Sequence, residues 1–242
     1  MTHLGLTFRS LTAAALIGAA ALGMTVTAAT AAAVPTAGMH GDPVAAAGYW
    51  VEQSLDDCSL MATADVVGQL TGHQPTETRI VLLAGATPSA HHAGPIYLPP
   101  PDPDDLDSGR GTDSRDLPIL LAHYGIDSVY TDDEVAAEVG VPTGMAALVQ
   151  ALDNGSKVIA GVNAEVIWGA HGDRTRGDHD LVVTGVDTAT GVVHLNDSGT
   201  ERGADEQVPI AVFEAAWRTS GHDMVVTTGK STPPCRPMVT PK

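Results

Sequence analysis

Three side chains in this 242-residue chain have the types needed for nucleophilic catalysis: Cys58, His179 and Asp197. Cys58 follows a polar turn and opens an apolar run with helical spacing, so we expect its thiol at the N-terminus of a helix. Unpaired N–H groups and the positive end of the helix dipole favour the thiolate there, which is the nucleophilic form. In such chemistry a histidine removes the thiol proton and a carboxylate stabilises the imidazolium. The three residue types therefore indicate attack on a carbonyl carbon.

A predicted hairpin brings the histidine and the carboxylate together. The strand that follows His179 and the next predicted strand are joined by a five-residue turn. If Val186 pairs with Val192 across this turn, Asp197 lies on the same face of the sheet as His179 and within reach of its side chain. A slip of one residue in this register would move Asp197 to the opposite face, and Asn196 is then the alternative orienting residue.

The developing oxyanion needs hydrogen-bond donors, and two lie close to the nucleophile in the sequence. These are the main-chain N–H of Cys58 and the side-chain amide of Gln53. Asp56 and Asp57 place negative charge beside the thiol, which would raise its pKa. Capping of the helix by one of these carboxylates, together with a protonated histidine partner, would offset that effect.

Charge and residue spacing limit the possible partners. The chain has 29 acidic and 12 basic residues, and a formal net charge of −17. Without a predicted leader, whose only charged residue is Arg9, the net charge is −18. Such a surface repels nucleic acid and anionic lipid, so we predict a peptide or protein substrate, no nucleic acid and no membrane partner. Ligand spacing with cysteine or carboxylate is absent at His91, His92, His171, His194 and His222, so we predict no metal and no cofactor.

The first 33 residues have the pattern of a secretory signal peptide. His3 and Arg9 precede an apolar run from Leu11 to Met24, and small residues follow this run. The run is rich in alanine and glycine and is shorter than the ~20 residues that a membrane-spanning helix needs. We therefore predict a secreted, extracellular protein.

Four segments follow from composition and periodicity. They are a signal peptide over residues 1–33, a linker over 34–48, one domain over 49–230 and a proline-rich tail over 231–242. Within the domain, residues 86–116 are rich in proline, glycine and aspartate, which favours a long and disordered loop.

The pattern within the domain predicts helices first and antiparallel strands later, an α+β order in which an N-terminal helical part packs on a C-terminal sheet. Helices are expected from residue 58 to a stop at Gly72 and over 76–84, 117–124, 144–152 and 212–217. Strands are expected over 157–163, 180–186, 191–195 and 224–228. Trp168 and Trp217 are interpreted as core residues.

These residues carry a resemblance to a known family. Gln53 and Asp57-Cys58 with their following helix, the segment Gly177–Val186, and Leu195–Gly199 together are similar to the C39-like peptidases, which belong to the papain-like cysteine peptidases. The resemblance extends from about Val51 to Thr228. It implies a papain-like fold and a peptidase activity.

The resemblance also implies roles for single residues. Cys58 corresponds to the nucleophile, His179 to the base, Asp197 to the residue that orients it, and Gln53 to the oxyanion donor. Gln53 is five residues before the cysteine, where six is typical of many relatives. Ser59 also stands where many members have glycine. Familiar members cut leader peptides after paired glycines on exporters, and we do not transfer that substrate.

Three functions remain open on the sequence. The first is a secreted papain-like cysteine peptidase that hydrolyses peptide or isopeptide bonds. The second is a non-catalytic secreted module that acts by binding, which a disulfide between Cys58 and Cys235 would favour. The third is a cell-wall amidase or endopeptidase of the NlpC/P60 kind, which also begins a helix with Asp-Cys-Ser, although Leu60 and Asp197 argue against it.

Overall fold

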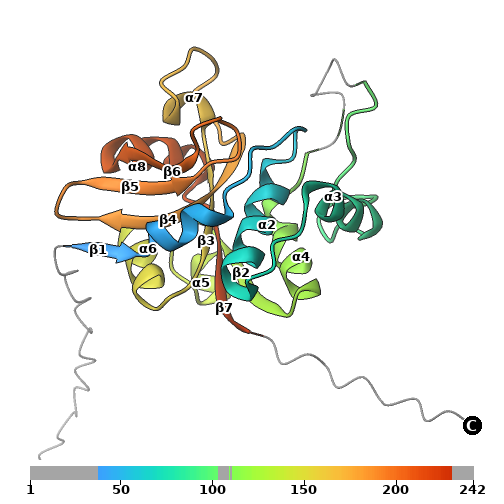
Figure 1. The fold of residues 1–242 in the computed structure, drawn as a ribbon, viewed down its shortest axis with the longest axis horizontal. Coiled ribbons are helices and arrows are strands. Elements are labelled where there is room, and N and C mark those ends of the chain that lie inside the picture. The colour runs from blue at the N-terminus through green and yellow to red at the C-terminus, as the bar shows by residue number, and fades with distance from the viewer. Residues whose placement is uncertain (1–37, 103–108, 110, 231–242) are drawn as a thin grey trace, which may run out of the picture. The chain divides into compact units, whose positions relative to one another are not determined.

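A computed structural model describes residues 38–102, 109 and 111–230. The predicted signal peptide, the first four residues of the predicted linker and the proline-rich tail with Cys235 lie outside the described residues. Within them, helices and one antiparallel sheet form an α+β fold (Figure 1), as the sequence predicts. None of the described helices combines the length and hydropathy that a membrane crossing requires.

The sheet has seven strands in the described chain, and six of them follow the order β2-β7-β3-β4-β5-β6. In chain order the strands are β1 (Met39–Gly41), β2 (Ile126–Thr131), β3 (Val158–Val162), β4 (His179–Asp187), β5 (Val192–Asn196), β6 (Ala204–Pro209) and β7 (Met224–Lys230). Strand β1 pairs with the end of β4 that β3 does not reach. The last strand therefore lies between β2 and β3, which places distant parts of the chain side by side.

The helices surround this sheet. They are α1 (Pro43–Ala46), α2 (Cys58–Thr71), α3 (Glu77–Ala86), α4 (Leu117–His123), α5 (Ala136–Val139), α6 (Met145–Asp153), α7 (Ala164–Ile167) and α8 (Ile210–Trp217). Short 3-10 helices cover Ala47–Tyr49, Ser114–Asp116 and Arg218–Ser220. Helix α2 ends at Gly72, whose left-handed φ of 75° suits a glycine cap.

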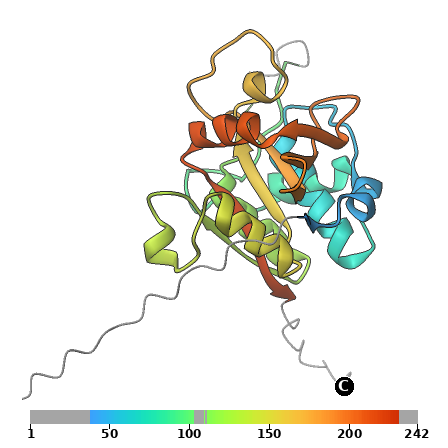
Figure 2. The same cartoon turned by 90° about the vertical axis from the view of Figure 1, so that its left-hand side faces the viewer.

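The central strands are apolar on both faces because helices cover both. Ile159, Val182 and Val225 pack in one cluster with helices α2, α3 and α4. Their chain neighbours Leu181 and Met224 face the other way and pack with α6 and α8. This alternation is the period of a strand. Figure 1 shows α2, α3 and α4 on one side of β3 and β7 and α6 and α8 on the other, and Figure 2 is the view from the α6 and α8 side.

The sequence located the elements with strong periodicity and missed the others. Each predicted helix and strand overlaps an observed one. Strand β6 was missed because most of its residues are polar and at least partly exposed, so that it has no apolar alternation. Strand β2 was missed for a similar reason, since only Ile126 and Thr131 at its two ends are buried.

The predicted linker over residues 34–48 is wrong for its described part. Strand β1 pairs with β4, and helix α1 follows with Pro43 at its start and Asp42 accepting a hydrogen bond from the N–H of Ala45. His40 is buried and lies 2.7 Å from Asp153. A strand of three residues and a helix of four are too short to leave a periodic pattern.

The expectation of a disordered loop over residues 86–116 is also wrong for the described part. Ile96 and Tyr97 are buried in the core. The N–H of Ile96 donates to the carbonyl of Thr87 at 2.9 Å, and the N–H of Ala90 donates to the Asp116 carboxylate at 2.9 Å. Two buried side chains and these hydrogen bonds therefore order a segment whose composition is typical of a mobile loop.

Candidate active site

Cys58 is the first residue of helix α2, as the sequence predicts. Its side chain is partly buried and its thiol is free. The main-chain N–H of Asp180 donates to the sulfur at 3.4 Å. Both the helix terminus and this donor favour negative charge on the sulfur.

His179 and Asp197 lie together beside this thiol. His179 Nε2 is 2.7 Å from Asp197 Oδ1, and both side chains are buried. Because Nε2 faces the carboxylate, Nδ1 is the nitrogen left for the thiol, and the charge of Cys58 acts on the imidazole. The three residues singled out in the sequence are thus brought to one place from α2, β4 and the loop after β5.

The hairpin reaches this arrangement through a register that differs from the predicted one. Val186 pairs with Val193 rather than with Val192. A bulge between Val183 and Gly185 then shifts the ladder by one residue. Val182 consequently pairs with Asn196, which is the pairing that the predicted register gives at this end. The error beside the turn is cancelled before the chain reaches the site.

Two tryptophans that the sequence did not implicate fix Asp197. Trp168 Nε1 donates to Asp197 Oδ2 at 2.8 Å, and Trp50 Nε1 donates to the Asp197 main-chain carbonyl at 2.6 Å. The Trp168 ring also lies against the His179 ring, with 5.3 Å between centroids. Trp168 is 43% exposed, so its interpretation as a core residue is wrong, whereas Trp217 is fully buried as expected.

Gly199 is required for the close approach of these rings. A Cβ at this position would lie 2.8 Å from the Trp168 ring and 3.1 Å from His179 Cε1. The N–H of Gly199 also donates to Asp197 Oδ1 at 2.8 Å. The residue after the Asp197-Ser198 pair therefore has to be small.

The charges of the site favour an imidazolium. Burial opposes protonation of His179, but the negative charge of Cys58 and the hydrogen bond to Asp197 raise its pKa well above the ordinary 6.5. Burial likewise opposes ionisation of Asp197, yet hydrogen bonds from His179 and Trp168 hold its pKa below the ordinary value of 3.8. The pair is therefore cationic histidine and anionic aspartate near neutral pH.

Asp57 occupies the N-cap position, but its side chain makes no capping hydrogen bond. It is only 2% exposed, and neither carboxylate oxygen has a hydrogen-bond partner. Burial, followed by the negative charges of Glu77 and Asp56, raises the pKa of Asp57 to about 7. Because the carboxyl is partly protonated near neutral pH, it places less negative charge beside the thiol than the sequence suggests.

Gln53 links two segments of the site and does not line the cleft. Its Nε2 donates to the carbonyl of Leu55 at 2.9 Å, and its Oε1 accepts from Ser198 Oγ at 2.8 Å. Its main-chain N–H donates to the Ser198 carbonyl at 2.9 Å. Gln53 therefore joins the segment before the cysteine to the segment after Asp197.

A cleft of about 460 Å³ opens beside Cys58 and His179. Its other lining residues are mostly polar or acidic: Asp56, Asp57, Ser59, Gly111, Thr112, Ser114, Gly161, Arg176, Gly177, Asp178, Asp180, Thr219, Ser220 and Asp223. Nowhere in the described chain do three or more His, Cys, Asp or Glu side chains form a group that could hold a metal ion.

Comparison with known proteins places the chain among relatives. No family model matches it. Uncharacterized protein Rv1268c of Mycobacterium tuberculosis and uncharacterized protein Mb1299c of Mycobacterium bovis are each 50% identical over 227 residues, which cover 91% of this chain and 96% of theirs. The chain belongs to the family of these mycobacterial proteins.

Solved structures identify the fold. A crystal structure assigned as a C39-like peptidase from Bacillus anthracis matches with a TM-score of 0.52 and 18% identity, and covers 76% of this chain and 96% of that one. A double-glycine motif protease from a transporter, in complex with its leader peptide, matches with a TM-score of 0.42 and 12% identity. The protein has the papain-like α+β fold of the C39-like peptidases, as the sequence resemblance implied.

Proposed function

We propose that this protein is a cysteine peptidase that hydrolyses peptide or isopeptide bonds, with Cys58 as nucleophile, His179 as general base and acid, and Asp197 as the residue that orients the imidazole. The observation that carries the proposal is the buried 2.7 Å contact between His179 Nε2 and Asp197 Oδ1 beside a free thiol at a helix N-terminus. That combination supplies a thiolate, a proton carrier and a fixed tautomer.

The steps follow from the positions of these groups. The Cys58 thiolate attacks the carbonyl carbon of the scissile bond. The oxyanion that forms accepts a hydrogen bond from the main-chain N–H of Cys58, which has no partner within the first turn of the helix. Gln53, which the sequence suggested as the other donor, does not line the cleft, so the N–H of Cys58 is the donor that we propose. The His179 imidazolium gives its Nδ1 proton to the leaving amine, which departs as the thioester forms. Neutral His179 then takes a proton from the water that attacks the thioester carbonyl. The C–S bond breaks, the acid product departs, and the Cys58 thiolate and His179 imidazolium are restored.

We also propose that the protein acts outside the cytoplasm on a peptide or protein substrate. The support is the signal-peptide pattern of residues 1–33 and the strongly acidic composition, which disfavours nucleic acid. The substrate would meet the enzyme after export.

Alkylation of the purified protein without reductant tests the proposal. Iodoacetamide labelling is followed between pH 5 and pH 9 and mapped by mass spectrometry. Cys58 should be modified at pH values well below ~8.5, the pKa of a free thiol. His179→Ala should abolish this early labelling. His194→Ala is the matched control, because His194 makes a similar 2.6 Å contact with Asp205 elsewhere on the sheet. Labelling of Cys58 only near ~8.5, or a Cys58–Cys235 disulfide, would contradict the proposal.

An activity assay completes the test. Wild-type protein should cleave unfolded protein substrates, and Cys58→Ala should not. Release of peptide fragments from purified peptidoglycan by wild type alone, with no cleavage of unfolded protein, would instead indicate a cell-wall amidase.

A further inference from the structure

We propose that the cleft beside Cys58 binds a peptide residue with a cationic side chain, lysine or arginine, whose charged group lies between Asp180 and Asp223. This inference rests on the proposed function and names its substrate class.

Two neighbouring strands and the residue before a third build the acidic part of the cleft. Asp180 on β4 pairs with Gly161 on β3, and the N–H of Gly161 donates to Asp223 Oδ1 at 2.9 Å. A Cβ at residue 161 would collide with that oxygen. The glycine thus leaves the space that the Asp223 carboxyl occupies. The main-chain N–H of Asp180 also donates to Cys58, and Asp180 and Asp223 line the same cleft as the nucleophile.

The partners of these carboxyls leave their charge unbalanced. Asp180 Oδ2 accepts hydrogen bonds from the hydroxyls of Ser59 at 2.5 Å and Ser114 at 2.9 Å. Within the described chain no lysine or arginine forms an ion pair with Asp180 or Asp223, and Arg176 is the one basic residue other than His179 that lines the cleft. Arg176 itself lies 3.6 Å from Asp173. A cation is therefore the complementary ligand.

Asp57 gives independent support. It lines the same cleft, is 2% exposed, and has two carboxylate oxygens without a hydrogen-bond donor. Burial and the charges of Glu77 and Asp56 raise its pKa to about 7, so its ionised form is disfavoured in the free protein. An ammonium or guanidinium group in the cleft carries several N–H donors and would favour that ionised form. No described group is arranged for a metal ion, so an organic cation fits the site better.

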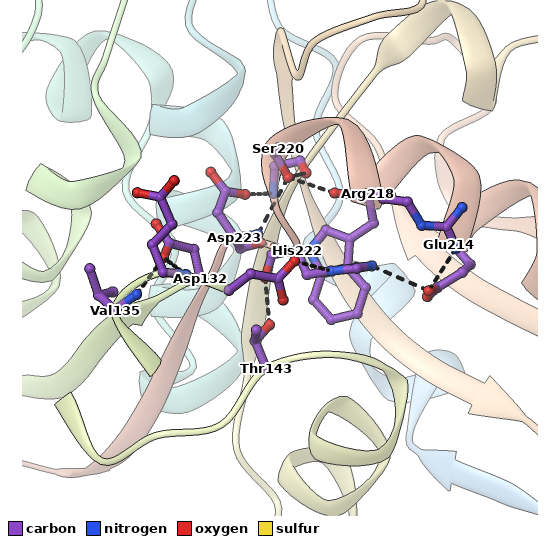
Figure 3. A network of polar contacts seen from close by, with 12 residues as sticks. Asp132, Val135, Thr143, Glu214, Arg218, Ser220, His222 and Asp223 are labelled. Atoms are coloured by element: carbon purple, nitrogen blue, oxygen red, sulfur yellow. Dashed lines mark hydrogen bonds and ion pairs between the residues drawn. The ribbon is translucent and has the colours of Figure 1, made fainter. Parts of the chain in front are cut away.

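A rigid turn holds Asp223 in place (Figure 3). His222 Nδ1 lies 2.7 Å from Asp133 Oδ2, and His222 Nε2 lies 3.2 Å from Glu214 Oε1. Thr143 donates to the main-chain carbonyl of His222, and Trp217 Nε1 donates to that of Asp223 at 2.6 Å. The cost of ordering this acidic group is therefore met by folding rather than by binding.

The titration of the acidic groups agrees with the geometry. Burial and then the charge of Asp180 raise the pKa of Asp223 to about 7, and burial raises the pKa of Asp180. Burial disfavours the ionised forms of these carboxyls in the free protein. A cation bound between them stabilises the ionised forms.

The charge preference of thiol reagents tests the site without requiring peptidase activity. Cys58 is modified with the cationic 2-aminoethyl and the anionic 2-sulfonatoethyl methanethiosulfonates, and the ratio of rates is compared with that of a reference thiol introduced by Ala189→Cys on an exposed turn. The rate with the cationic reagent divided by the rate with the anionic reagent should be about tenfold higher at Cys58 than at the reference thiol. Asp223→Asn should lower this ratio at Cys58 about fivefold, because little solvent separates the Asp223 carboxylate from a reagent in the cleft. Gly161→Ala should lower it too, because it moves the carboxyl at unchanged net charge. Glu138→Gln, which removes a charge outside the cleft, is the control.

Peptide binding to Cys58→Ala gives the second readout. A fluorescent peptide with one central arginine should bind more tightly than the same peptide with citrulline, its neutral isostere, and Asp223→Asn should remove the difference. Rapid labelling of Cys58 with no cation preference and equal binding of both peptides would overturn this inference and leave the proposed function intact. Slow labelling by every reagent together with preferential binding of the arginine peptide would overturn the proposed function and support the cation site.

Discussion

Replacing Trp168 with phenylalanine should raise the pH at which Cys58 becomes reactive. The substitution keeps an aromatic ring beside His179 and removes the 2.8 Å hydrogen bond from Nε1 to Asp197 Oδ2. A hydrogen bond to a charged group contributes ~1.5–3 kcal/mol. Because Trp168 is 43% exposed, water replaces part of the lost bond, and we take the lower end of that range.

The sign follows from the carboxylate. Trp168 holds Asp197 Oδ2 and thereby keeps Oδ1 directed at His179 Nε2. Without that donor the carboxylate turns toward water, its contact with the imidazolium weakens, and the thiolate–imidazolium pair forms less readily. A change of ~1.4 kcal/mol corresponds to one pKa unit, so the midpoint of alkylation should move up by about one pH unit. The measurement is the rate of iodoacetamide labelling of Cys58 between pH 5 and pH 9.

Trp50→Phe is the matched control. Trp50 donates to the main-chain carbonyl of Asp197, which is uncharged, at 2.6 Å. Its loss should lower stability by ~0.5–1.5 kcal/mol in urea and leave the pH profile of labelling unchanged. An unchanged profile in Trp168→Phe, or an equal shift in both variants, would refute the reasoning.

Three further predictions follow from single contacts. Gly199→Ala should slow alkylation of Cys58 severalfold at pH 7 while the fold is retained by circular dichroism, because the new methyl group displaces the indole and imidazole rings. The free energy of unfolding should fall between pH 5 and pH 8, because Asp57 and Asp223 have folded-state pKa values of about 7, above 3.8, and so bind more protons folded than unfolded; urea midpoints measure this, and Asp57→Asn should flatten the slope. Asn196→Ala should lower stability by ~1–3 kcal/mol in urea, because it leaves the buried Asp65 carboxylate, 2.7 Å from Asn196 Nδ2, without that donor.

The sequence was sufficient for the three proposed catalytic residues because each stands at the boundary of a strongly patterned element. Cys58 opens a helix, His179 opens a strand, and Asp197 directly follows another strand. Boundaries of this kind are visible in hydrophobic periodicity. The predicted strand register beside the turn was wrong by one residue. A bulge that has no signal in the sequence restores the predicted pairing near the site.

The residues that surround these three could not be predicted, because their contacts span large separations without a pattern. Trp168 is 29 residues from Asp197 along the chain, and Trp50 is 147 residues away. The acidic part of the cleft needs β7 to lie beside β3, so that Asp223 meets Gly161 over 62 residues. Such proximity follows from strand order, which is a property of the whole sheet.

The acidic surroundings of Cys58 pose an apparent conflict, because negative charge disfavours a thiolate. The structure lessens the conflict, since the pKa of Asp57 is about 7 and the N–H of Asp180 points at the sulfur. The same acidity favours the imidazolium, since Asp180 and His179 attract each other. A cationic substrate residue between the carboxyls would weaken that attraction and lower the pKa of His179 at the stage when the imidazolium must release its proton to the leaving amine. If so, the arginine peptide should exceed its citrulline counterpart in kcat as well as in binding, and a difference confined to KM would show that the cation only anchors the substrate.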